Sequence, residues 1–240
     1  MARRFLLPAT VFIAMFATLT GLVFSAGAQA QTGQQSAEAD GSPIGPAPRH
    51  DLSGTWTPAS RPGAGIQANG VQAMPNDGRP EHALPYTPYG LEVYESHKPL
   101  EGVNAVLPAF HNDPRNKCEP LGFPRMNHYN VRMTQIFQNP YKLAILYEYD
   151  NKWRNIWIDG RELPEVVDGG VIAGGTYKAT KWHGYSVGEW VDDYTLVVRT
   201  VGTMPEDRIW LDSTGRPISD AVTVEETFRR VDSDHMEWTE

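Results

Sequence analysis

The chain has 240 residues, of which 40% are apolar and 10% aromatic, and its formal net charge is −8. The aromatic content argues against a disordered chain, and the 22 glycines and 19 prolines argue against a coiled coil or helical bundle. The acidic balance argues against nucleic acid as a partner, because phosphate binding needs a basic surface.

Residues 1–30 have the pattern of a secretory signal peptide. An arginine pair precedes an apolar run from Phe5 to Phe24, and Ala28-Gln29-Ala30 supplies the small residues that signal peptidase requires. We expect cleavage after Ala30 and a periplasmic or secreted protein with no stable membrane association. The alternative is an uncleaved membrane anchor, because the apolar run is nearly long enough to cross a bilayer.

The next hundred residues contain few regular elements. Residues 31–50 are rich in Gln, Ser, Gly, Pro and Ala without an apolar period, which predicts a disordered linker. A first strand is expected within residues 51–56. The rest of residues 51–130 should form an irregular, proline-rich strap with a short helix at residues 90–96.

Residues 131–240 predict an antiparallel β core in the same domain. Short runs of strand-forming residues alternate with turn signals, and Asp159-Gly160 is typical of a hairpin turn. This spacing indicates an all-β fold, an antiparallel meander that closes as a barrel or folds as a sandwich. Because the alternation is unbroken at Glu240, we expect the natural sequence to continue. Strands are expected at 131–139, 141–149, 153–158, 175–182, 186–191, 195–201, 221–231 and from 236 onward.

Several sequence blocks within residues 50–240 are familiar as a set. They include Asp51-Leu52-Ser53-Gly54-Thr55-Trp56, Cys118 to Arg125, Trp182 to Trp190, Thr195 to Val198 and Glu226 to Arg230. Together they resemble a large family of secreted bacterial proteins of unassigned function that open with Asp-Leu-Ser-Gly-x-Trp. The resemblance implies export and a β-rich fold but brings no established activity.

Two details follow from that resemblance. Such proteins typically continue beyond this point, often with another cysteine, which would account for the single Cys118. Arg199 stands where an acidic residue is usual, so a ligand held near it would differ. Separately, Gly54-Thr55-Trp56 resembles the opening of lipocalins, in which a first-strand tryptophan packs under a late arginine; Arg229 or Arg230 would take that place here.

The first candidate site is a charge pair. If residues 150–152 form a three-residue loop, Glu148 lies directly opposite Arg154 among aliphatic neighbours. Such a pair would orient a polar ligand or hold a general base, or it is a structural ion pair on a half-buried sheet face. With His183 it forms the acid/base set of an enzyme.

The second candidate is a group of aromatic side chains in the β core. Tryptophan and tyrosine give flat apolar walls with one hydrogen-bonding edge, which suits aromatic, terpenoid or sugar ligands at a barrel mouth. The alternative is ordinary core and rim packing. Glu226 is an acid expected to point inward from its strand. The predicted ligand-binding residues are Tyr147, Trp157, Trp182, Tyr185, Trp190, Trp210 and Glu226, with Trp153 in the same group.

Other motifs give no site. Gly184-x-Ser186-x-Gly188 has the letters of a hydrolase nucleophile elbow but lies between strands, so its glycines should allow a bend. The seven histidines show no metal-binding spacing, although His111, Asp113 and His128 would meet through the strap, and we predict no metal and no cofactor. Asp193 and Asp212 are expected to cap turns.

The sequence therefore predicts an exported β-barrel-like protein that binds a small, partly apolar or aromatic ligand, with its oligomeric state open. The first alternative is a metal-independent lyase, isomerase or hydratase that uses Glu148, Arg154 and His183. The second is an envelope interaction module that recruits a protein through an open sheet edge.

Overall fold

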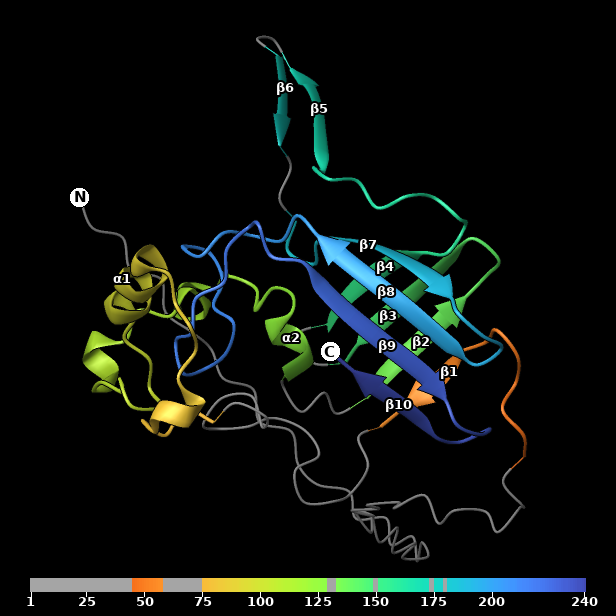
Figure 1. The fold of residues 1–240 in the computed structure, drawn as a ribbon, viewed down its shortest axis with the longest axis horizontal. Helices are drawn as coiled ribbons and strands as arrows, with labels where there is room; N and C mark the ends of the chain where they lie inside the picture. The colour runs from red at the N-terminus through yellow and green to blue at the C-terminus, as the bar shows by residue number, and fades with distance from the viewer. Residues whose placement is uncertain (1–44, 58–74, 129–132, 149–150, 173–174, 179–180) are drawn as a thin grey trace, which may run out of the picture. The chain divides into compact units, whose positions relative to one another are not determined.

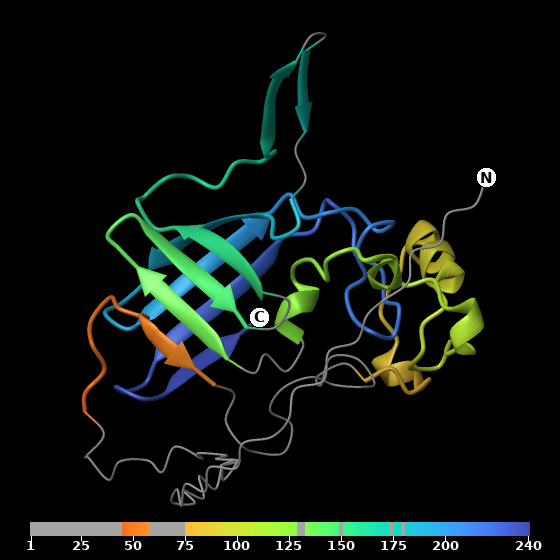
Figure 2. The same ribbon diagram turned by 180° about the vertical axis from the view of Figure 1, so that it is seen from behind.

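A computed structural model describes residues 45–57, 75–128, 133–148, 151–172, 175–178 and 181–240 (Figure 1). Strands make up most of the regular secondary structure of these residues, which confirms the predicted all-β class. Eight strands form one strongly curled sheet, a half-barrel, in the order β1-β2-β3-β4-β7-β8-β9-β10 (Figure 2). The strands of this sheet are β1 (Gly54–Trp56), β2 (Thr134–Gln138), β3 (Lys142–Tyr147), β4 (Lys152–Trp157), β7 (Tyr185–Trp190), β8 (Thr195–Val201), β9 (Val224–Arg230) and β10 (Met236–Thr239).

The inner face of the sheet carries the hydrophobic core. Buried and exposed side chains alternate along β2, β3, β8 and β9, as expected of strands with one face toward a core. The segment from Leu121 to Met126 packs into the same core, so the proline-rich strap helps to fill the half-barrel. The buried core residues are Leu52, Leu121, Phe123, Met126, Ile136, Leu143, Ile145, Tyr147, Ile156, Leu196, Val198, Val224 and Phe228.

The described part of the strap, residues 75–128, is irregular, as predicted, and contains the predicted short helix. This helix, α1 (Pro88–Ser96), begins two residues earlier than expected because Thr87 caps it, its side chain accepting from the Gly90 N–H at 3.0 Å. The remaining turns are short: the 3₁₀ helices η1 (Pro80–His82), η2 (Pro108–Phe110) and η3 (Pro114–Lys117), and α2 (Arg125–His128). Among the described residues no helix has the length and apolarity needed to span a membrane.

The predicted hairpin at Asp159-Gly160 is wrong. The neighbour of β4 in the sheet is β7, and the two strands run parallel, so the meander is not entirely antiparallel. The intervening chain instead forms a separate two-stranded hairpin from β5 (Asp168–Ile172) and β6 (Gly175–Lys178), of which β5 was not predicted. Parallel neighbours need a long connection, and residues 158–184 supply it.

The β3–β4 turn also differs from the prediction. Tyr147 pairs with Lys152 and Ile145 pairs with Arg154, so the connection has four residues rather than three. The register is shifted by three residues, and because side chains alternate with a period of two, the shift turns β3 over. Ile145 and Tyr147 face the core with Arg154, and Leu146 faces solvent.

Side chains bridge the two ends of the curled sheet. The Arg230 guanidinium lies 4.7 Å from the centre of the Trp56 ring and donates to the Asp51 and Ser53 carbonyls at 3.1 and 3.0 Å. The expected contact between a first-strand tryptophan and a late arginine is therefore made by Arg230, whereas Arg229 pairs with Glu237. A single contact of this kind does not test the lipocalin resemblance, which stays a prediction.

The end of the predicted linker makes specific contacts. Arg49 pairs with the Asp193 carboxylate at 2.7 Å, the His50 N–H donates to the Asp193 carbonyl, and the Gly45 N–H donates to Ser233 Oγ. The linker prediction thus does not hold for residues 45–50, while residues 31–44 lie outside the described residues.

Candidate functional site

The inner face of the half-barrel contains a buried charge pair, but its carboxylate is Glu226 rather than Glu148. Arg154 on β4 is 1% exposed and Glu226 on β9 is fully buried. Arg154 Nη1 donates to Glu226 Oε1 at 2.9 Å, and Nη2 donates to Oε2. The inward orientation predicted for Glu226 is confirmed.

Neighbouring polar groups saturate this pair. Arg154 Nε donates to Ser186 Oγ at 3.1 Å and Nη2 donates to Thr200 Oγ1 at 2.8 Å. Glu226 Oε1 also accepts from Asn127 Nδ2 at 3.1 Å and from Trp238 Nε1 at 3.2 Å. Buried charges need such compensation, because each loses its hydration shell.

The electrostatics of the pair follow from its burial. Desolvation pulls the pKa of Arg154 down, but the adjacent Glu226 carboxylate outweighs it, so the pKa of Arg154 is raised and the guanidinium stays charged. Burial raises the pKa of Tyr147, whose hydroxyl donates to Asn127 Oδ1 at 3.2 Å. The Phe123 ring covers the guanidinium, with Arg154 Cζ 4.0 Å from the ring centre. The arrangement is that of a structural ion pair closed off from solvent.

The acid/base set predicted for an enzyme does not assemble. Glu148 lies exposed in the β3–β4 turn, because the register shift places it beyond the paired residues. His183 lies half-buried just before β7. The exposed Glu148 and the buried Arg154 therefore do not form the predicted pair.

The predicted aromatic group is dispersed. Trp153 and Trp157 face outward because Arg154 and Ile156 face inward, and the Arg161 guanidinium covers Trp157 at 3.7 Å. Trp210 and Tyr147 are buried at 1% and 2% exposure, so they are packing residues. The other members lie apart: Tyr185 accepts from Arg161, Trp182 lies under Arg208 and Trp190 contacts the His50 ring.

The other motifs behave mainly as structural elements. Gly184 has φ +63°, and a Cβ there would lie 2.5 Å from Thr200 Cγ2, so the glycine permits the predicted bend. Asp212 caps a turn, accepting from the Thr214 N–H at 2.9 Å, as predicted. The turn after β7 is capped by Asp192 rather than Asp193, whose carboxylate binds Arg49.

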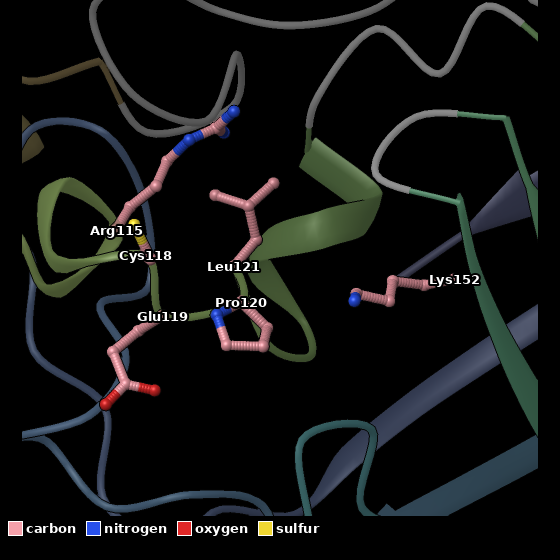
Figure 3. A pocket seen from close by; sticks show the side chains of 6 residues that line it. All are labelled: Arg115, Cys118, Glu119, Pro120, Leu121 and Lys152. Atoms are coloured by element: carbon pink, nitrogen blue, oxygen red, sulfur yellow. The ribbon is translucent and has the colours of Figure 1, made fainter.

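A small pocket lies where the strap meets the start of β4 (Figure 3). Its volume is about 270 Å³, below the roughly 300–1,000 Å³ typical of ligand sites. Figure 3 shows Lys152 extending toward Pro120 and Leu121, with Cys118 and Arg115 on the opposite wall. Its size and its single hydrophobic wall make it a poor candidate for an organic ligand.

A larger cleft lies within the strap, in a region that sequence reasoning treated as structural. Its volume is about 440 Å³, within the range of small-molecule sites. Helix α1 forms one wall through Leu91 and Tyr94, and the turns around η1 form another. The described lining residues are Pro75, Asn76, Gly78, Arg79, Pro80, His82, Ala83, Leu84, Pro85, Tyr86, Leu91, Tyr94, Val103 and Arg216.

A chain of directed hydrogen bonds supports the base of this cleft. Asn76 Oδ1 accepts from the Val103 N–H at 3.2 Å, which fixes the orientation of the amide. Asn76 Nδ2 then donates to Tyr94 Oη at 2.8 Å and to Thr214 Oγ1 at 2.9 Å. The Thr214 hydroxyl donates a hydrogen bond to Asp212, which also pairs with Arg216 at 3.1 Å. The cleft is therefore built on a rigid polar support.

Two tyrosines form its aromatic wall. The Tyr86 and Tyr94 rings stack with centres 5.2 Å apart. Burial, followed by the neighbouring Tyr94, raises the pKa of Tyr86 to about 12, although a hydrogen bond from Arg216 opposes the shift. Tyr86 therefore keeps its proton at neutral pH and can act as a donor.

His97 closes α1 beside the cleft. Its ring is 8% exposed, stacks on Trp210 with centres 4.5 Å apart, and donates from Nδ1 to the Gly215 carbonyl at 2.7 Å. Burial lowers the pKa of His97, partly opposed by this hydrogen bond and by Asp113. The imidazole is neutral in the folded protein near pH 7.

This shift predicts a pH dependence of stability. In the unfolded chain His97 takes up a proton near its ordinary pKa of 6.5, whereas in the folded chain it stays neutral to lower pH. The free energy of unfolding therefore falls as the pH drops below about 6.5. In urea titrations between about pH 7.5 and 5.5, the wild type should lose more stability than His97→Gln, whose amide can still donate to Gly215. Equal losses in the two proteins would contradict this assignment.

In the described part of the chain no three His, Cys, Asp or Glu side chains form a group that would hold a metal ion. His111 and Asp113 lie 4.0 Å apart, but Asp113 forms a two-pronged ion pair with Arg125 at 2.9 and 2.6 Å. The side chain of His128 lies outside the described residues.

The chain matches no protein-family model, and no curated protein or solved structure is significantly similar to it. The site must therefore be judged on its own geometry.

Proposed function

We propose that this protein binds a small, partly apolar ligand in the strap cleft, defined by Tyr86, Leu91, Tyr94, Val103 and Arg216. The observation that carries the proposal is an open cleft of about 440 Å³ whose apolar walls enclose a few convergent polar groups. The half-barrel interior is a weaker candidate, because core side chains and a saturated ion pair fill it.

The walls support a binding role more than a catalytic one. Leu91 and Val103 are 44% and 53% exposed, so apolar surface is presented to solvent around the cleft. Covering such surface with a ligand is favourable at about 25 cal/mol per Å². The predicted leader at residues 1–30 fits a protein that meets such ligands outside the cytoplasm.

Filling the cleft should abolish binding. In thermal-shift and native mass spectrometry screens of aromatic, terpenoid and aliphatic compounds, a ligand at about 100 times its Kd should raise the Tm by roughly 5–10 °C. Val103→Trp places an indole in the cleft at an exposed position and should remove the shift without changing stability much.

The matched control is Val191→Trp, at a position that is 59% exposed and follows β7 rather than lining the cleft. It should bind as the wild type does. Binding that survives Val103→Trp would move the site elsewhere, and the absence of any ligand from the whole screen would count against a small-molecule function.

A further inference from the structure

The cleft shows an excess of hydrogen-bond donors over acceptors. Asn76 donates to the Tyr94 hydroxyl, so that oxygen acts as an acceptor toward the protein. Arg216 donates to the Tyr86 hydroxyl in the same way. Each phenolic O–H can also donate one hydrogen bond, and among the described residues no acceptor is assigned to either.

The charges around the cleft point in the same direction. Its described lining includes Arg79, His82 and Arg216 but no aspartate or glutamate. Asp212 pairs with Arg216 from behind, and Asp77 contacts both His82 at 2.8 Å and Arg79 at 3.4 Å, although the Arg79 side chain remains 67% exposed at the rim. A group that enters the cleft therefore meets hydrogen-bond donors and the exposed Arg79 side chain on a largely apolar background.

We propose that the ligand is an organic carboxylate, whose oxygens accept the phenolic protons of Tyr86 and Tyr94 while its apolar body lies against Leu91 and Val103. Hydrogen bonds from a neutral donor to an ionised acceptor are shorter and about twice as strong as neutral ones. The two rings stack and both line the cleft, and in the proposed complex both hydroxyls address the same carboxylate. This assignment rests on the proposed function and specifies its ligand class.

Matched pairs of probes test the assignment. Affinities of trans-cinnamate and cinnamyl alcohol, and of decanoate and decanol, are measured by titration calorimetry at about pH 7.5. Each carboxylate should bind at least about tenfold more tightly than its alcohol. Tyr94→Phe and Tyr86→Phe should each weaken carboxylate binding by about tenfold or more and reduce the preference over the alcohol.

Tyr141→Phe is the control, because Tyr141 is 66% exposed in the β2–β3 turn and does not line the cleft. It should leave every affinity unchanged. Equal binding of carboxylates and alcohols, both lost in Val103→Trp, would overturn the carboxylate assignment and leave the cleft as the site. Failure of every probe would count against both proposals, and a carboxylate preference that survives both tyrosine variants would overturn the role of the tyrosines.

Discussion

Replacing Glu226 by glutamine is expected to destabilise the fold by about 3–5 kcal/mol. The substitution keeps the shape of the side chain but removes its charge, while Arg154 keeps its own charge at 1% exposure. Removing one partner of a buried pair costs far more than the pair contributes, because an uncompensated charge remains inside. Urea denaturation followed by tryptophan fluorescence measures the change in the free energy of unfolding.

The neighbouring residue provides a matched control. Glu225 lies on the same strand but faces outward, where it pairs with Arg199 at 2.9 Å and is 55% exposed. Glu225→Gln should change stability by less than about 1 kcal/mol, because solvent screens exposed ion pairs. Similar losses for the two glutamine variants would show that Glu226 is not buried as described.

A double substitution separates charge compensation from packing. Arg154→Met with Glu226→Leu removes both charges and should recover much of the stability lost in Glu226→Gln, since apolar replacements of buried pairs are often neutral or stabilising. Asn127 and Trp238 would lose their acceptor, which limits the recovery. A double variant less stable than Glu226→Gln would indicate that the hydrogen bonds outweigh the charge.

The sheet was largely predictable because its signals are local. Residues 195–201 were predicted as a strand with the bounds that β8 has, since alternating apolar residues between two turns suffice to define a half-buried strand. Glu226 was expected to face inward on the same grounds. Its partner was not found, because Arg154 lies 72 positions away in sequence and two other strands separate β4 from β9.

The candidate charge pair of Glu148 and Arg154 was wrong because the β3–β4 turn differs in length from the expected one. The prediction of Glu148 opposite Arg154 depended on a three-residue loop, and one further residue in that loop changed every facing pair of the hairpin. No residue in the turn distinguishes the two lengths by itself. The buried face of β3 decides the register instead, because Leu143, Ile145 and Tyr147 must reach the core together.

The strap cleft was not predicted from the sequence, for a different reason. Its supporting residues come from three distant segments, around Asn76, Tyr94 and residues 212–216, and no periodic pattern links them. The sequence feature that could have indicated the cleft is the presence of asparagine and tyrosine between prolines. Hydrogen bonds from such side chains can order a segment that lacks the backbone hydrogen bonds of a sheet.

Phe123→Ala is expected to cost about 3–5 kcal/mol, the second large effect. The ring is fully buried, belongs to the same core as the sheet and lies over the Arg154 guanidinium, so truncation leaves a cavity and removes a cation–π contact. Phe137→Ala, at a site 52% exposed on β2, should cost less than about 1 kcal/mol.

The size of this loss in the free energy of unfolding shows how much the strap contributes to the stability of the half-barrel. Leu121, Phe123 and Met126 join the core from one segment, and the Phe123 N–H donates to the Trp182 carbonyl at 2.8 Å. If the strap is integral, Phe123→Ala should lower the denaturant midpoint of one cooperative transition. Two separate transitions, or a loss as small as that of Phe137→Ala, would show that the half-barrel folds without this segment, and the cleft would then lie on an independently folding element.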